Sequence, residues 1–308
     1  MQLYLPIAEL PLNLFLLIGM GGAIGFISGL FGVGGGFLLT PLLIFVGVPA
    51  PVAVATSSVH IAASSVTGSL TYWRRNAVDF KLGLVLIVGG AAGTVLGVFF
   101  FNQMRKLGHL DLVITLSYVT LLMSVGILML GESLRAMFRQ HRNRTVPLRL
   151  PGEHRWYEGL PLRMRFHRSK ISTSILPLVV LGCVIGFIGT VLGIGGGFLV
   201  VPALIYLFRV PTSVVVGTSL LQILVTMIIA TFLHATISQA VDVLLALTLV
   251  VGGVIGAQFG ARTGQSLKGE QFRLLLALLI LSVGFRFAFD IVGAPLDRFS
   301  INAVELER

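Results

Sequence analysis

The sequence predicts an all-helical integral membrane protein built from two inverted repeats, each with about five membrane segments and a glycine-broken helix. Three observations predict this fold class. The composition is strongly apolar, the second half of the chain repeats the first, and the basic residues are unevenly placed. A water-soluble globular domain is excluded, because it would need a more polar surface than this composition supplies.

The apolar composition is the first observation. Hydrophobic residues make up 56% of the chain, charged residues 11%, and the mean hydropathy is +0.97, whereas a soluble domain carries about 25% charged residues. Apolar runs of about 20 residues have the length that crosses a bilayer as a helix. Five such runs are Leu82–Phe101, Leu112–Leu130, Ile175–Ile194, Val243–Phe259 and Leu274–Val292.

Cysteine use and the N-terminal charge exclude several kinds of processing and chemistry. No Lys or Arg precedes Arg74, so a cleavable signal peptide is not expected. Cys183 is the only cysteine, which excludes an intrachain disulfide and a thiolate metal site. We expect neither a metal nor a cofactor.

Most of the positive charge lies in one segment. Between Arg135 and Lys170 there are nine Arg and one Lys against two Glu, which gives +8 of the formal +10. Basic residues beside membrane spans mark the cytoplasmic side and attract anionic lipid headgroups, so nucleic acid is not expected as a partner. We predict a first transmembrane repeat at 1–134, a basic cytoplasmic linker at 135–172 and a second repeat at 173–308.

The two halves carry matching motifs. The segment 25–41 reads GFISGLFGVGGGFLLTP and the segment 186–202 reads GFIGTVLGIGGGFLVVP. Downstream, Asp79 matches Asp242, and the glycine ladder Gly89, Gly93, Gly97 matches Gly252, Gly256, Gly260. These ladders place glycines on one helix face and predict close helix packing, within or between subunits. A homodimer is therefore one of the expected arrangements.

The charge pattern predicts that the repeats are inverted. With the basic linker inside, the loop that begins at Arg74 is also inside, whereas its repeat-equivalent 235–242 has no Lys or Arg and is expected outside. Equivalent loops on opposite sides require an odd number of crossings in each half. We expect five segments per half with both termini outside, an arrangement that also places Arg105 and Lys106 outside.

The glycine motifs are the first candidate site. Contiguous glycines break helices, and broken backbone persists in a bilayer only where protein or water satisfies it. One interpretation is that the N–H groups that start the following helices bind an anion; the other is a tight turn for close packing. A dinucleotide site is excluded, since no strand precedes the motif. The candidate substrate-binding residues here are Gly34, Gly35, Gly36, Gly195, Gly196 and Gly197.

A polar helix face is the second candidate site. Thr56, Ser57 and His60 have the repeat counterparts Thr218, Ser219 and Gln222. Small hydroxyl residues cap helices or donate to a ligand, and polar groups in hydrocarbon are costly enough to indicate function. A histidine on an apolar helix is also compatible with simple packing, so both interpretations of His60 stay open.

Charged and aromatic residues near the helix ends have two interpretations each. Arg74 and Arg75 follow Tyr72 and Trp73, as interface anchors and cytoplasmic markers do, or they guard the entrance for an anion. His234, the counterpart of Tyr72, has the same two interpretations, an interface residue or part of an entrance for an anion. Arg286 lies inside the last apolar run and either snorkels, pairs with Asp290 or contacts substrate.

At the paired glycine and hydroxyl motifs the chain resembles the sulfite exporter TauE/SafE family of bacterial anion transporters. The resemblance rests on GVGGGFLLTP and GIGGGFLVVP, on VATSS and VGTSL, and on the repeat length. It implies an inner-membrane protein that exports sulfite, an organosulfonate or a related anion. It also implies a substrate site among the two sets of candidate residues named above, with His60 replaced by Gln222 in the second copy.

The leading hypothesis is a carrier that works by alternating access, in which His60 binds the anion or carries a coupled proton. A channel or facilitator would use the same polar path. A membrane scaffold or receptor that recruits a partner through the basic linker is a further alternative. We do not expect an enzyme, because the sequence has no HExxH, no Gly-x-Ser-x-Gly and no cluster of intramembrane acids.

Overall fold

The computed structural model describes residues 2–31, 34–141, 163–166, 168–169, 171–208, 210–263 and 269–292. Most of the basic linker therefore lies outside the described residues. In the described part the first half holds the helices α1 (Leu14–Phe31), α2 (Gly36–Phe45), α3 (Ala50–Arg74), α4 (Phe80–Lys106) and α5 (Leu110–His141). The second half holds α6 (Ile175–Leu192), α7 (Gly197–Tyr206), α8 (Thr212–Leu233), a π-helical turn η1 (His234–Ser238), α9 (Val243–Thr263) and α10 (Gly269–Val292).

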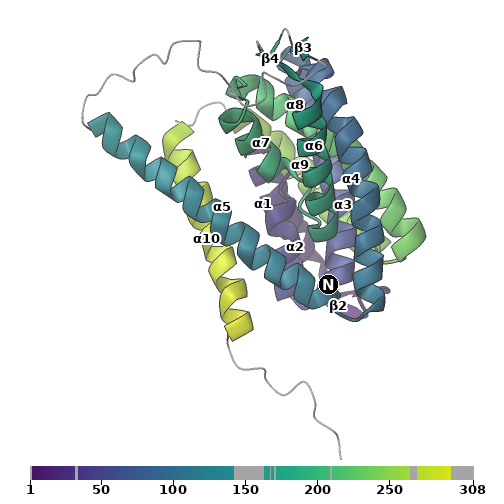
Figure 1. The fold of residues 1–308 in the computed structure, drawn as a ribbon. Coiled ribbons are helices and arrows are strands. Elements are labelled where there is room, and N and C mark those ends of the chain that lie inside the picture. Colours follow the sequence, from purple (N-terminus) through teal and green to yellow (C-terminus); the bar gives the residue numbers. More distant parts are fainter. Residues whose placement is uncertain are drawn as a thin grey trace, which may run out of the picture. The chain divides into compact units, whose positions relative to one another are not determined.

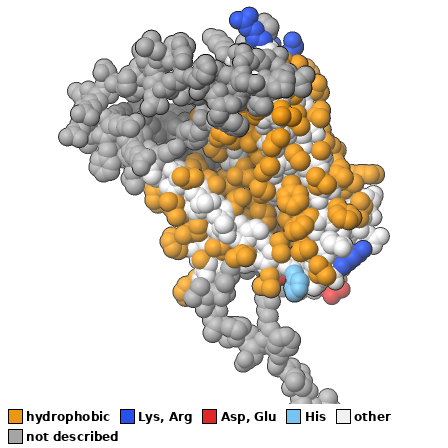
Figure 2. Space-filling model, in the orientation of Figure 1, with side chains coloured by type: hydrophobic (Ala, Val, Ile, Leu, Met, Phe, Trp, Pro, Cys, Tyr) orange, Lys and Arg blue, Asp and Glu red, His pale blue; other side chains and the backbone are white. Residues whose placement is uncertain are grey.

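The protein is a multi-pass, all-helical membrane protein, as the sequence predicts. Within the described residues, five segments are long and apolar enough to cross a bilayer: Phe80–Lys106, Leu110–Gly131, Ile175–Leu192, Val214–Ser238 and Val243–Gly260. The predicted runs Leu82–Phe101, Leu112–Leu130 and Val243–Phe259 lie inside three of them. On the face drawn in Figure 2, hydrophobic side chains cover most of the described surface, while Lys and Arg gather toward its two ends.

Two short β-hairpins were not predicted from the sequence. Strands β1 (Gln2–Leu5) and β2 (Leu10–Asn13) pair antiparallel before α1, and β3 (Arg163–Phe166) and β4 (Ile171–Ser174) pair antiparallel before α6. The second hairpin falls at the end of the predicted linker. Four-residue strands give no periodic signal long enough to identify. Figure 1 shows the β1–β2 hairpin at one end of the packed helices and the β3–β4 hairpin at the other end.

Contacts divide the chain into two compact units. The first comprises residues 1–114 and 144–268, and the second comprises 115–143 and 269–308. In the first unit α1 packs along α9, α4 packs along α6, and α3 packs along α8 (Figure 1). In the second unit the Tyr118 and Phe287 rings stack with their centroids 5.5 Å apart.

The glycine ladders produce the close packing that they predict, within one chain. The Cβ atom of a side chain at Gly89 or Gly93 would overlap the backbone of Val179 or Cys183 on α6. The ladder at Gly252, Gly256 and Gly260 lies in the same way against the backbone of α1, at Ile18, Gly22 and Phe26. Without Cβ atoms the helix axes approach closely, which compensates for the lack of a hydrophobic driving force between helices in lipid.

Candidate functional site

The glycine motifs separate the short helices α2 and α7 from the helices before them. Gly34 and Gly35 have φ of 85° and 66°, and Gly195 and Gly196 have φ of 79° and 75°. Glycine adopts this left-handed conformation without steric cost. Gly35 and Gly196 cap the N-termini of α2 and α7, and their carbonyls accept from Leu38 and Leu39, and from Leu199 and Val200.

The N-termini of α2 and α7 meet each other inside the first unit. The rings of Phe37 and Phe198, each the second residue of its helix, stack with centroids 5.2 Å apart. The Thr40 hydroxyl donates to the Gly193 carbonyl at 3.1 Å. A Cβ added at Gly36 would lie 2.7 Å from the carbonyl oxygens of Gly193 and Ile194. Two helix ends that each carry partial positive charge therefore converge from opposite halves of the chain.

Two isoleucines fill the space beside the converging glycines. A Cβ at Gly34 would lie 3.4 Å from Ile61 Cγ2 and 3.5 Å from Ile223 Cδ1. A Cβ at Gly195 would lie 2.8 Å and 3.4 Å from the Cγ2 atoms of the same two residues. Ile61 and Ile223 are fully buried repeat counterparts on α3 and α8. We call this group of glycine backbones, Ile61 and Ile223 the glycine cradle.

Of the four predicted hydroxyl residues, the two threonines contact the opposite half of the chain. Thr218 Oγ1 accepts a hydrogen bond from the backbone N–H of Asp79 at 3.0 Å, and Thr56 Oγ1 accepts from the N–H of Asp242 at 3.1 Å. Ser219 donates to the carbonyl of Val216 within its own helix. Ser57 Oγ is buried and has no partner.

Each aspartate also holds one hairpin. Asp79 Oδ1 accepts from Leu82 N, and Oδ2 accepts from both the backbone and the hydroxyl of Ser169 in the β3–β4 hairpin. Asp242 repeats this arrangement with Leu245 N for Oδ1, and with Ile7 N and Ala8 N of the β1–β2 hairpin for Oδ2. We call the two groups, each an aspartate with its threonine and its hairpin, the reciprocal ties.

His60 and Gln222 point toward α9 and α4 rather than into the glycine cradle. His60 Nδ1 donates to the carbonyl of Leu249 at 3.0 Å, and its ring occupies the space that a Cβ at Gly253 would need. A Cβ at Gly90, the counterpart of Gly253, would lie 3.2 Å from Gln222 Nε2. Both side chains are buried, and both His60 Nε2 and Gln222 Oε1 lack partners. Unpaired polar atoms are costly in an apolar interior.

The structure therefore brings the predicted residues together in two groups. Gly34, Gly35, Gly36, Gly195, Gly196 and Gly197 lie around the two isoleucines, whereas Thr56, Thr218, His60 and Gln222 join α3 and α8 to the facing helices. The sequence reasoning did not identify Ile61 and Ile223, because apolar side chains on an apolar helix carry no signal. Arg74 and Arg75 are exposed at the end of α3.

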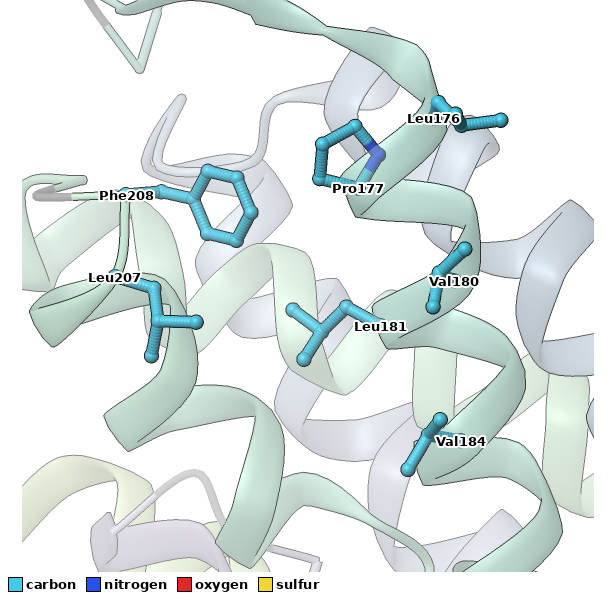
Figure 3. A pocket seen from close by; sticks show the side chains of 7 residues that line it. All are labelled: Leu176, Pro177, Val180, Leu181, Val184, Leu207 and Phe208. Carbon is cyan, nitrogen blue, oxygen red and sulfur yellow. The ribbon is translucent and has the colours of Figure 1, made fainter. Parts of the chain in front are cut away.

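An apolar groove lies away from all of these residues. It has a volume of about 350 Å³ and is lined by Leu176, Pro177, Val180, Leu181, Val184, Leu207 and Phe208 (Figure 3). The view shows α6 on one side and the end of α7 on the other, with no polar side chain among the labelled residues. An apolar groove on a helix that crosses a bilayer fits lipid or apolar chains better than a small anion.

Among the described residues no group of three or more His, Cys, Asp or Glu side chains is placed to hold a metal ion.

Comparisons with known proteins match almost the whole chain. A family model described as sulfite exporter TauE/SafE matches residues 17–287. A "Probable membrane transporter protein YjnA" of Bacillus subtilis is 30% identical over 278 residues, which cover 88% of this chain and 98% of that protein. A "Probable membrane transporter protein" of Xylella fastidiosa is 32% identical over 282 residues, covering 88% and 93%. No solved structure matches.

Proposed function

Because this chain belongs to the sulfite exporter TauE/SafE family of membrane transporters, we propose that it exports a small sulfur-containing anion by alternating access. Sulfite and organosulfonates are the proposed substrates, and the bacterial cytoplasmic membrane is the proposed location, with the basic linker inside. The observation that carries the proposal is the convergence of two helix N-termini at the glycine cradle. Helix N-termini bind anions through unpaired N–H groups and a favourable dipole.

The contact pattern supports an inverted repeat. Equivalent helices α3 and α8 run antiparallel, since Gly68 lies beside Leu220 and Tyr72 beside Gly217. The pair of α1 with α9 is matched by the pair of α6 with α4. Such pairs are related by a two-fold axis perpendicular to the helices. When this axis lies in the membrane plane, the two halves of the chain have opposite orientations in the membrane. Alternating access needs two such halves that rock about a shared central site.

The reciprocal ties are suited to act as gates. Each tie joins one half of the chain to the other through a buried hydrogen bond between threonine and aspartate. The ties hold hairpins that lie at opposite ends of the helical unit (Figure 1). Breaking one tie while the other remains would open the central site toward one side of the membrane only.

His60 is the proposed site for a coupled proton. Its Nδ1 already donates to the Leu249 carbonyl, so Nε2 carries a hydrogen only when the ring is protonated. An anion can therefore accept a hydrogen bond from Nε2 only when the His60 ring has bound a proton. The adjacent residue in the chain, Ile61, lines the glycine cradle, whereas the His60 ring lies on the side of α3 that faces α9.

A tethered carboxylate tests the glycine cradle. Ile61→Glu introduces a negative charge beside the two helix N-termini, and Ile61→Gln is the matched neutral control. We expect proteoliposomes with wild type to take up one of labelled sulfite, sulfoacetate or taurine with saturation. Ile61→Glu should lose this flux, while Ile61→Gln should retain part of it.

The same pair has a readout that does not need a known substrate. Burial penalises a carboxylate at any apolar position, so Met227→Glu and Met227→Gln, at a buried site in the same apolar cluster, serve as the reference pair. If the cradle favours anions, the melting temperature should fall less from Ile61→Gln to Ile61→Glu than from Met227→Gln to Met227→Glu, because a negative charge at a helix N-terminus gains about 0.3–2 kcal/mol. An equal or larger fall at Ile61 would contradict an anion cradle. Flux that rises linearly with concentration would indicate a pore instead of a carrier.

A further inference from the structure

A second group of buried polar side chains lies between α4, α6 and η1. His234 is fully buried, its Nδ1 lies 3.2 Å from Ser238 Oγ, and its Nε2 has no partner. Its ring meets Phe101 of α4 edge-on with centroids 4.8 Å apart. The backbone carbonyl of Thr190, on α6, faces the same ring as an acceptor but makes no hydrogen bond of normal geometry with Nε2. Thr190 Oγ1 is also buried without a partner.

The π-helical turn that carries His234 exists because of one extra residue. Asp79 lies seven positions after its repeat-mate Tyr72, whereas Asp242 lies eight positions after His234. The additional residue is absorbed in η1, His234–Ser238. Single π-turns occur frequently at functional sites, where they redirect a side chain. Here the result is a buried His234, while Tyr72 remains partly exposed.

The group has the second glycine motif at one end and an exposed arginine at the other. Thr190 precedes Gly193, whose carbonyl faces the N-terminus of α2, by less than one helical turn. At the other end the exposed Arg105 donates to the Ser238 carbonyl. Thr190, His234, Ser238 and Arg105 thus follow one another from the buried cradle outward. The counterparts of Thr190 and His234 in the first half are Gly29 and Tyr72, so that half lacks this series.

The chemistry of the group fits an oxyanion. When the Ser238 hydroxyl donates to Nδ1 of His234, the ring hydrogen of the neutral imidazole lies on Nε2, the atom without a partner. The Thr190 hydroxyl and the Arg105 guanidinium add further donors, and none of these side chains is a carboxylate. Unlike His60, His234 is therefore able to donate to an anion without binding a proton.

We propose that Thr190, His234 and Ser238 form a second oxyanion-binding site, reached between the glycine cradle and the surface at Arg105. The proposal rests on the proposed function, since the ligand is the transported anion on its way through the protein. In the topology inferred from charge this end faces outward, so the site is the last one that an exported anion occupies.

Cysteine reactivity tests this site. In a Cys183→Ala background, which removes the only native cysteine, Thr190→Cys reports on access and Ser238→Cys is a second reporter. Val215→Cys is the matched control, because it is fully buried on α8 in an apolar cluster with Leu82, Leu86 and Leu204, apart from the glycine cradle. The probes are a sulfonate-bearing thiosulfonate reagent, and sulfoacetate as the competing oxyanion.

We expect the reagent to modify Thr190→Cys faster than Val215→Cys. Sulfoacetate at about ten times its dissociation constant should slow the modification about tenfold, as mass action requires for a blocked site. His234→Phe, which keeps the aromatic contact with Phe101, should remove this protection. The protection should persist in Ile61→Glu, because the second site is separate from the cradle.

Three outcomes overturn the proposal. If Thr190→Cys and Ser238→Cys react no faster than Val215→Cys, the group is inaccessible packing and not a binding site. Reaction without protection by sulfoacetate, in a protein that transports sulfoacetate, would show access without a binding site. Protection that survives His234→Phe would assign binding elsewhere. Protection in a wild type that moves no sulfoacetate would instead contradict the proposed function and leave the site standing.

Discussion

Removal of one threonine hydroxyl provides a direct test of the reciprocal ties. Thr218→Val keeps the shape of the side chain but leaves the backbone N–H of Asp79 without its acceptor at 3.0 Å. Asp79 is 4% exposed, so water does not readily replace the lost partner. A buried donor without a partner costs about 1–3 kcal/mol. Since 1 kcal/mol shifts the melting temperature of a large domain by about 2–4 °C, we expect a decrease of roughly 2–12 °C.

Thermal unfolding of the purified protein in detergent, followed by the loss of the monodisperse chromatographic peak, measures this decrease. Thr56→Val should lower the melting temperature by a similar amount, because its hydroxyl accepts from Asp242 N at 3.1 Å. Thr226→Val is the control on the same helix as Thr218. Its hydroxyl donates only to the carbonyls of Gln222 and Ile223, and it should change the melting temperature little.

Two results would refute this reasoning. Thr218→Val and Thr226→Val with the same melting temperature would mean that the Asp79 N–H does not depend on Thr218. A Thr218→Val protein that melts like wild type but loses flux would assign the hydroxyl to the substrate, as the sequence first suggested.

Three further predictions follow from other contacts. Gly93→Ala should lower the melting temperature by an amount that corresponds to about 1–3 kcal/mol of overpacking against Cys183, whereas Gly19→Ala, with nothing within 4 Å, should be neutral or slightly stabilising. Asp79→Ala should accelerate amide hydrogen exchange at Ser169, which loses its acceptor, without affecting exchange in the β1–β2 hairpin; equal acceleration in both hairpins would mean global loosening. Arg75→Cys and Ile237→Cys, at equivalent exposed positions in a Cys183→Ala protein, should react with an impermeant thiol reagent from opposite sides of the membrane. Labelling of both from one side would contradict the inverted topology.

The sequence alone determined the membrane class, the helix order and the close contact faces of this protein. Hydropathy is a property of the residues themselves, so the spans around Leu82–Phe101 and Val243–Phe259 could be located without a structure. Contiguous glycines placed the break between α1 and α2 at Gly34 and Gly35, since glycine alone adopts their positive φ at no cost. The ladder at Gly93 indicated a tight contact because helical periodicity is local.

Only the tertiary structure decided what the polar residues contact. Thr56 and Asp242 are 186 positions apart. No local sequence pattern predicts which buried N–H group will donate to a given threonine hydroxyl. The roles of Ile61 and Ile223 depend in the same way on which helices face each other. His234 and Tyr72 occupy equivalent sequence positions, yet one extra residue in η1 accompanies burial of the first and not of the second. Burial is set by the neighbouring helices, and these are brought together only when the chain folds.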